Sequence, residues 1–213
     1  MLRRILAGSA CLLLALPALS LAEVLTLEVD PNHSEVGFLV KHNVVSRVPG
    51  RFDKFTGTVT IDPKDPSTMK LQGNIDATSI DTGNPKRDEH LKSPDFFDVA
   101  NNPTITFTSK KVTKNGDNWD VVGDIMIRGV TKEITLQVEP PAFMQARGGT
   151  LAGIEAKGKI NRKDFGVNWN RTLDQGGVVV SDDVDLVLHV EAHTPRPEQA
   201  AQPAAPKPET AKK

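Results

Sequence analysis

Most of the chain between residues 24 and 191 alternates between apolar and polar residues. The clearest stretch runs from Ser34 to His42, where the residues on one face are Val36, Phe38, Val40 and His42. A period of two is typical of a β-strand with one dry face and one wet face. The pattern predicts about nine strands, over residues 24–29, 34–42, 51–61, 71–77, 104–108, 119–127, 134–138, 151–160 and 178–191.

Short turn sequences separate these segments, among them Val48-Pro49-Gly50, Asn115-Gly116 and Arg128-Gly129-Val130. No long helical pattern occurs, so the dry faces must pack on a second sheet or close on themselves. Closure removes exposed edges. We therefore expect an all-β fold, an antiparallel up-and-down β-barrel of about eight strands, with a two-sheet sandwich as the alternative. A barrel of that size is either filled with side chains or holds one small ligand.

One long segment, residues 81–99, interrupts the alternation with the sequence DTGNPKRDEHLKSPDFFDV. Its Asn84-Pro85 pair favours the start of a helix, which predicts a short helical insertion near residues 85–98. Phe96 and Phe97 follow, and adjacent residues cannot both face one core in regular structure. Either one caps the core while the other packs under the loop, or the pair forms an apolar gate at the barrel mouth.

The two ends of the chain differ from the middle, which leaves residues 23–193 as the folded domain. Residues 1–22 carry two arginines, an apolar run and small residues before Ala22, as a secretory signal does. We expect cleavage after Ala22 and a periplasmic location. A lipoprotein alternative at Cys11 is disfavoured because Gly8 stands where leucine is expected. Residues 194–213 are rich in Pro, Ala and Lys and predict a disordered tail.

Composition excludes several classes of function. The full chain has a formal net charge of −1, and removal of Arg3 and Arg4 with the signal takes it to −3. Such a chain lacks the clustered basic face of a nucleic-acid-binding protein. Its hydrophobic content of 38% and charged content of 25% suit a soluble domain, and we expect no transmembrane segment in the mature chain. The single cysteine, Cys11, lies in the signal, so thiol chemistry and disulfides are not expected.

Catalytic and metal-binding motifs are missing from the sequence. There is no Gly-x-Ser-x-Gly elbow, no phosphate-binding loop and no His-x-x-x-His spacing. His33 follows a turn and is expected to hydrogen-bond it. Asp88 and His90 resemble an acid–base pair, but residues two apart point to different sides of a helix. We therefore predict no catalytic residue, no metal and no cofactor.

Six motifs occur in order and resemble those of the YceI-like family of exported bacterial proteins, over residues 26–192. They are Asp30-x-x-His33-Ser34-x-Val36-x-Phe38, Gly50-x-Phe52 with Phe55-x-Gly57, the segment from Ile80 to Phe97, Pro103-x-Ile105-x-Phe107-x-Ser109, Gly123-Asp124-x-x-Ile127-x-Gly129-Val130-Thr131-Lys132, and Asn161-Arg162-x-Asp164-Phe165-Gly166. The resemblance implies a lipocalin-like antiparallel barrel. It also implies an elongated apolar cavity for isoprenoid quinones, polyprenyl phosphates or other long-chain amphiphilic lipids, without an established catalytic activity.

The alternation and the resemblance together predict the residues of a lipid site. The residues predicted to line the cavity or stand near its ends are Phe38, Val40, Ile75, Phe96, Phe97, Ile105, Phe107, Ile125, Ile127 and Trp169. His42, Arg87 and His90 are predicted to meet the polar head. Two alternatives stay open: a filled barrel that binds a periplasmic partner, and a lipid-modifying enzyme. Assembly into a homodimer also stays open.

Overall fold

The computed structural model describes residues 23–43, 45–146, 148–172 and 178–195. Within these ranges, twelve strands join in one sheet, accompanied by the helix α1 (Pro85–Lys92) and three short 3-10 turns. The strands are β1 (Leu25–Val29), β2 (Glu35–His42), β3 (Ser46–Phe52), β4 (Phe55–Asp62), β5 (Asp65–Asp76), β6 (Ile80–Asp81), β7 (Thr104–Asn115), β8 (Asn118–Ile127), β9 (Val130–Val138), β10 (Ala142–Ala146), β11 (Gly149–Asn161) and β12 (Val180–His193). The 3-10 turns are η1 (Pro31–His33), η2 (Ala77–Ser79) and η3 (Arg162–Phe165).

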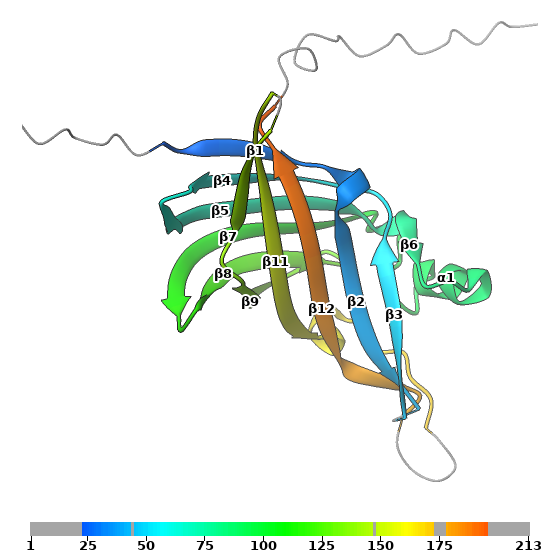
Figure 1. The fold of residues 1–213 in the computed structure, drawn as a ribbon. Helices are drawn as coiled ribbons and strands as arrows, with labels where there is room; N and C mark the ends of the chain where they lie inside the picture. The colour runs from blue at the N-terminus through cyan, green and yellow to red at the C-terminus, as the bar shows by residue number, and fades with distance from the viewer. Residues whose placement is uncertain (1–22, 44, 147, 173–177, 196–213) are drawn as a thin grey trace, which may run out of the picture.

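Eight strands close into a ring in the order β1-β4-β5-β7-β8-β9-β11-β12, and β12 pairs back with β1 (Figure 1). All of these pairings are antiparallel. β11 and β12 pair along most of their length, whereas β12 meets β1 only through Glu28↔His193 and Val29↔Ala192. The predicted all-β class, antiparallel pairing and eight-strand ring are confirmed.

Between β1 and β4 the chain leaves the ring and forms a flap of two strands, β2 and β3. β2 pairs with β12, β3 pairs with β2, and the short β6 pairs with β3. The predicted turn at Val48-Pro49-Gly50 is wrong, because these residues lie inside β3 and Pro49 is paired with Leu39. Beside Pro49 the other edge of β3 has no partner strand among the described residues, since β6 reaches only Arg51 and Phe52, and an edge position tolerates proline. The chain turns instead at Asn43, where φ is 49°.

The predicted helical insertion is present as α1, which is shorter than expected. Asn84 caps its first turn by accepting a hydrogen bond from the Arg87 backbone N–H at 3.2 Å, and Pro85 opens the helix. The helix ends at Lys92, and residues 93–98 form turns. In Figure 1, α1 and β6 lie at one end of the ring, next to the flap. No helix among the described residues is long and apolar enough to cross a membrane.

Two groups of buried side chains form the core inside the ring. The first includes Leu27, Ile61, Met69, Val121 and Val138, each at most 2% exposed. The second lies toward α1 and includes Phe52, Ile80, Ile105, Ile127 and Phe165. Further inward-pointing apolar side chains along the same strands are only partly buried. The predicted signal over residues 1–22 lies outside the described residues, as does the predicted tail beyond residue 195.

Candidate ligand cavity

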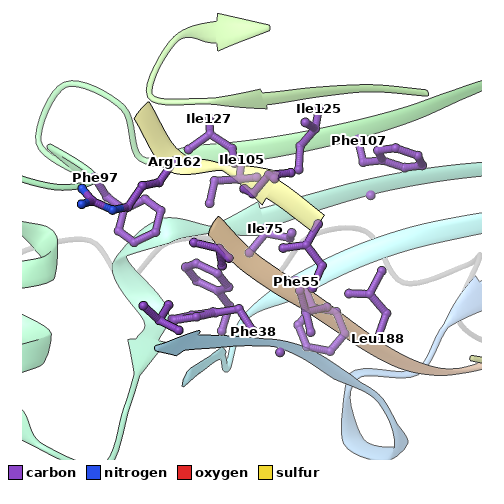
Figure 2. Close-up of a pocket in the computed structure, with 18 of the residues that line it drawn as sticks. Phe38, Phe55, Ile75, Phe97, Ile105, Phe107, Ile125, Ile127, Arg162 and Leu188 are labelled. Carbon is purple, nitrogen blue, oxygen red and sulfur yellow. The ribbon is translucent and has the colours of Figure 1, made fainter. Parts of the chain in front are cut away.

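The ring encloses a cavity of about 400 Å³, which is within the usual size range of small-ligand sites, about 300–1,000 Å³. Every ring strand contributes to its wall, together with β2, β3 and α1. Figure 2 shows aromatic and aliphatic side chains from β2, β4, β5, β7, β8 and β12 turned toward a common space. The wall is therefore apolar along most of its length, with polar side chains restricted to a few positions.

Inward-pointing side chains that a filled core would bury stay partly exposed here. Phe38, Ile75 and Phe107 point inward and line the cavity, yet each is only half-buried. Interiors without cavities are close-packed, so exposure of this kind reports empty space rather than loose packing. The resemblance implied such a cavity, while the strand pattern alone allowed a filled interior as well.

Inward-facing glycines shape the space. The ring of Phe107 lies where a side chain at Gly123 would stand, since a Cβ there would be 2.6 Å from Phe107 Cζ. Phe38 covers Gly50 in the same way, with a distance of 2.2 Å to Cζ. At Gly73 no side chain in the described part of the chain takes this role: a Cβ would meet only the Thr56 carbonyl oxygen, at 4.0 Å. Aromatic rings thus fold back against the wall, and the space in front of Gly73 is left open.

The structure places every residue that the sequence predicted for the lipid site at the wall of this cavity. The apolar ones are Phe38, Val40, Ile75, Phe96, Phe97, Ile105, Phe107, Ile125, Ile127 and Trp169, and the polar ones are His42, Arg87 and His90. Sequence reasoning missed other wall residues, such as Phe55, Leu188 and Arg162. Contact of any of these side chains with a ligand stays a prediction.

An aromatic cluster lies at the end of the cavity toward α1. Phe97 packs edge-on against Phe52, with ring centroids 5.8 Å apart. Phe96 and Trp169 lie 5.2 Å apart, and the ring of His90 stands edge-on to each of them at 5.0 Å. Both phenylalanines face the cavity although they are neighbours in sequence, because they lie in turns and not in regular structure.

Hydrogen bonds fix the polar side of this end. The buried carboxylate of Asp88 accepts from the Thr82 backbone N–H at 3.0 Å and from its hydroxyl at 2.5 Å. Arg87 donates from Nε to the Thr82 hydroxyl at 2.7 Å and from Nη2 to the Thr82 carbonyl at 2.6 Å. His90 Nε2 lies 2.9 Å from Asp95 Oδ2. Asp88 and His90 therefore have separate hydrogen-bond partners, as the sequence predicted for two residues that point to different sides of a helix.

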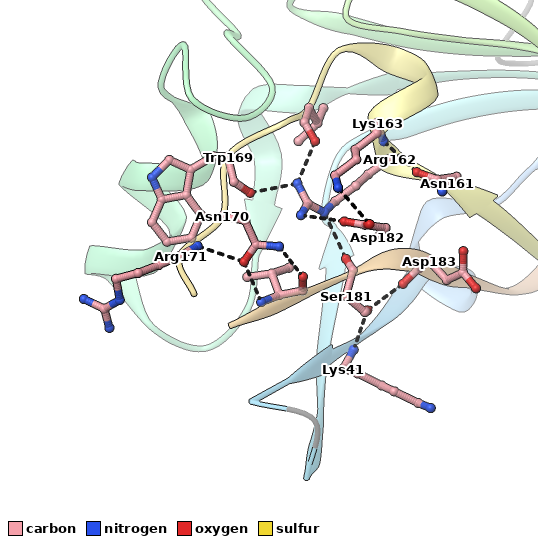
Figure 3. Close-up of polar contacts among 12 residues, drawn as sticks. Lys41, Asn161, Arg162, Lys163, Trp169, Asn170, Arg171, Ser181, Asp182 and Asp183 are labelled. Atoms are coloured by element: carbon pink, nitrogen blue, oxygen red, sulfur yellow. Dashed lines mark hydrogen bonds and ion pairs between the residues drawn. The ribbon is translucent and has the colours of Figure 1, made fainter. Parts of the chain in front are cut away.

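Arg162 is a wall residue that the sequence motif contained but did not single out. It lies at the start of η3, is 6% exposed, and burial lowers the pKa of its guanidinium while the charge of Asp182 opposes this shift. Figure 3 shows its contacts: Nε donates to the Ser181 carbonyl at 2.9 Å and Nη2 to Asp182 at 3.2 Å. Nη1 donates to the carbonyls of Val167 at 2.6 Å and Trp169 at 2.9 Å. The arginine thus holds the segment that carries Trp169 against β12.

A separate group lies at η1, outside the cavity. Carboxylate or ring atoms of Asp30, His33 and Glu191 come within 4.8 Å of one another. The contacts have a local explanation, because Asp30 caps η1 and its Oδ2 lies 2.8 Å from His33 Nδ1. The prediction that His33 hydrogen-bonds its own turn is confirmed.

Comparison with known proteins agrees with this architecture. The sequence profile of the YceI-like domain matches residues 27–192. Protein YceI of Escherichia coli O17:K52:H18 is 40% identical over 166 residues, covering 78% of this chain and 84% of its own length. A UPF0312 protein of Staphylococcus aureus strain N315 is 42% identical over 164 residues, covering 76% of this chain and 94% of its own.

Solved structures show the same fold. The YceI protein of Campylobacter jejuni has a TM-score of 0.64 and 32% identity, and the match covers 73% of this chain and 90% of that one. BcnA of Burkholderia cenocepacia has a TM-score of 0.66 and 26% identity, over 76% of this chain and 98% of that one. With the profile match and relatives at 40% identity or more, the chain belongs to the YceI-like family.

Proposed function

We propose that this protein binds a long-chain isoprenoid or a related amphiphilic lipid, without catalysis, by enclosing the hydrocarbon tail in the cavity of the ring. The observation that carries the proposal is the half-buried state of inward-pointing side chains such as Phe38, Ile75 and Phe107. A guest with a flexible apolar chain would cover these side chains and complete the core.

Burial of the tail supplies enough free energy for such binding. Each CH₂ removed from water contributes about 0.8 kcal/mol, so one five-carbon isoprene unit contributes roughly 3–4 kcal/mol before ordering costs. Association and ordering costs of several kcal/mol are offset by a few such units. The tail therefore dominates affinity, and the contacts predicted for His42, Arg87 and His90 orient the head.

One neighbour in structure is described as a binder of this ligand class. A domain of Saccharophagus degradans, described as a polyisoprenoid binding domain, has a TM-score of 0.55 and covers 81% of this chain and 100% of its own. At 17% identity this likeness concerns the fold alone. With the signal predicted over residues 1–22, the proposed setting is the periplasm, and the proposed role is storage, transport or protection of the lipid.

Native mass spectrometry tests the proposal directly. Protein purified from cells, or the ligand-free protein mixed with geranylgeraniol, is expected to show a lipid adduct that survives gentle desolvation. Recovery of ligand-free protein alone, with no uptake of the prenyl alcohol, would argue for a protein-binding module in place of a lipid carrier. Turnover of the lipid that is lost in Asp88→Asn or His90→Gln would instead support an enzyme.

A further inference from the structure

The charged side chains at the cavity wall all have one sign. The ionisable residues that line it are Lys41, His42, Arg87, His90 and Arg162. In the part of the chain that the structure describes, no aspartate or glutamate lines it. A neutral head group would not require this bias, because hydroxyl and carbonyl groups are bound equally well by neutral partners.

Two of these cations belong to one region at the end of the cavity. Arg162 donates to the backbone carbonyl of Trp169, and the indole of Trp169 stands against His90. His90 follows Arg87 by three residues on α1, so the two lie on neighbouring positions of one helix face, and both line the cavity with Arg162. Lys41 is excluded from this region, since its side chain extends away from Arg162 in Figure 3.

Of the carboxylates near the region, Asp95 pairs with His90, and Asp88 accepts from the Thr82 hydroxyl that also accepts from Arg87. Asp182 is shared by Arg162 at 3.2 Å and Lys163 at 2.8 Å, so one carboxylate faces two cations. Four of the five N–H groups of Arg162 have acceptors, and the second N–H of Nη2 has none among the described residues. Arg87 donates only to neutral oxygens of Thr82, and its Nη1 has no acceptor within the same part of the chain.

We propose that the end of the cavity between α1 and η3 binds an oxyanion head group, a phosphate monoester or a carboxylate, through Arg87 and Arg162. This rests on the proposed function, because the tail of the same lipid would occupy the cavity. Trp169 and both arginines line the cavity together with its apolar wall residues. A guest would therefore leave its charge at this end and bury only its hydrocarbon.

Three probes with the same tail test the proposal: geranylgeraniol, geranylgeranoic acid and geranylgeranyl monophosphate. The full-length mature protein is expected to bind the two anionic lipids at least about tenfold more tightly than the alcohol, since charge-assisted hydrogen bonds are the stronger ones. The difference should shrink as ionic strength rises to about 1 M, where exposed charges are screened. Comparing the affinities of geranylgeranoic acid and geranylgeranyl monophosphate shows which oxyanion is preferred.

Arg87→Gln is the informative variant, because Arg162 also holds the backbone of the Trp169 segment. It should weaken binding of the anionic lipids about tenfold more than it weakens binding of the alcohol. Arg171→Gln is the matched control, since Arg171 is exposed, follows Trp169 closely and does not line the cavity. Equal binding of all three probes, or equal losses in both variants, would overturn the anionic head site while the tail-binding function stands. No binding of any probe would overturn the proposed function itself.

Discussion

Replacing Gly73 by leucine would place a side chain in the open part of the cavity. Gly73 lies on the inward face of β5, between Leu71 and Ile75, and it lines the cavity. A Cβ there meets no atom nearer than the Thr56 carbonyl oxygen, at 4.0 Å. The backbone at this position does not have a positive φ, so a leucine fits it without strain.

The structure predicts opposite signs for binding and stability. A leucine side chain has about four carbons and would displace a similar number from the guest, which at about 0.8 kcal/mol each weakens binding by roughly 3 kcal/mol, or about a hundredfold. The free protein should unfold with the same free energy or gain about 0.5–1 kcal/mol, because glycine is unfavourable within a strand. An overpacked core would instead lose about 1–3 kcal/mol.

Two measurements and one control decide the matter. Titration with geranylgeraniol gives the affinity, and urea unfolding of the ligand-free protein gives the stability. Gly153→Leu, on the exposed face of β11, shares the backbone effect and should leave the affinity unchanged. A stability loss above about 1 kcal/mol relative to this control would show that the site is already packed. Unchanged affinity in Gly73→Leu would refute the placement of the tail.

Three further predictions concern other sites. Lipid binding should shift the emission of Trp169, one of two tryptophans in the chain; a fluorescence titration should keep the shift in Trp119→Phe and lose it in Trp169→Phe. In urea unfolding, Asp88→Asn should leave the free energy of unfolding nearly unchanged, because Oδ1 alone accepts both hydrogen bonds from Thr82. Asp88→Ala should lower it by about 2 kcal/mol. The hydrogen bond between His33 and Asp30 raises the pKa of His33 and lowers the pKa of Asp30. The raised pKa of His33 stabilises the fold fully below the ordinary histidine pKa of about 6.5, and this stabilisation is lost as pH rises through the raised pKa. The lowered pKa of Asp30 stabilises the fold above the ordinary aspartate pKa of about 3.9, and this stabilisation is lost as pH falls through the lowered pKa. The stability gap between the native protein and His33→Gln should therefore be widest between about pH 4 and 6.5 and narrow at higher pH; a gap that is constant from about pH 5 to 9 would contradict this reading.

The ring was predictable because one rule applies along the whole chain. Period-two alternation identifies the inward positions of each strand, so residues such as Ile75 and Ile125 could be assigned to the interior from sequence alone. The same rule missed β3, since tolerance of Pro49 depends on an unpaired edge that local sequence does not reveal. Strand pairings with distant partners decide such cases.

Whether the interior is empty or filled could not be predicted from the alternation, because the same residue types serve both. The difference depends on where aromatic rings lie: Phe38 folds over Gly50 and Phe107 over Gly123, and both contacts join different strands. Arg162 was not predicted as a wall residue for a similar reason. Its sequence neighbours suggest a surface turn, and only the packing of η3 against β12 buries it.

The ring closes only when β1 pairs with β12, and this pairing is slow to form. Glu28 and Val29 must find His193 and Ala192, at opposite ends of the domain, before the wall is complete. Contacts of such long sequence separation form late and slowly, since the loop they close has the greatest entropy to lose. A nascent chain that still lacks β12 would form an open sheet and not a closed ring, so only the complete domain could retain a bound lipid.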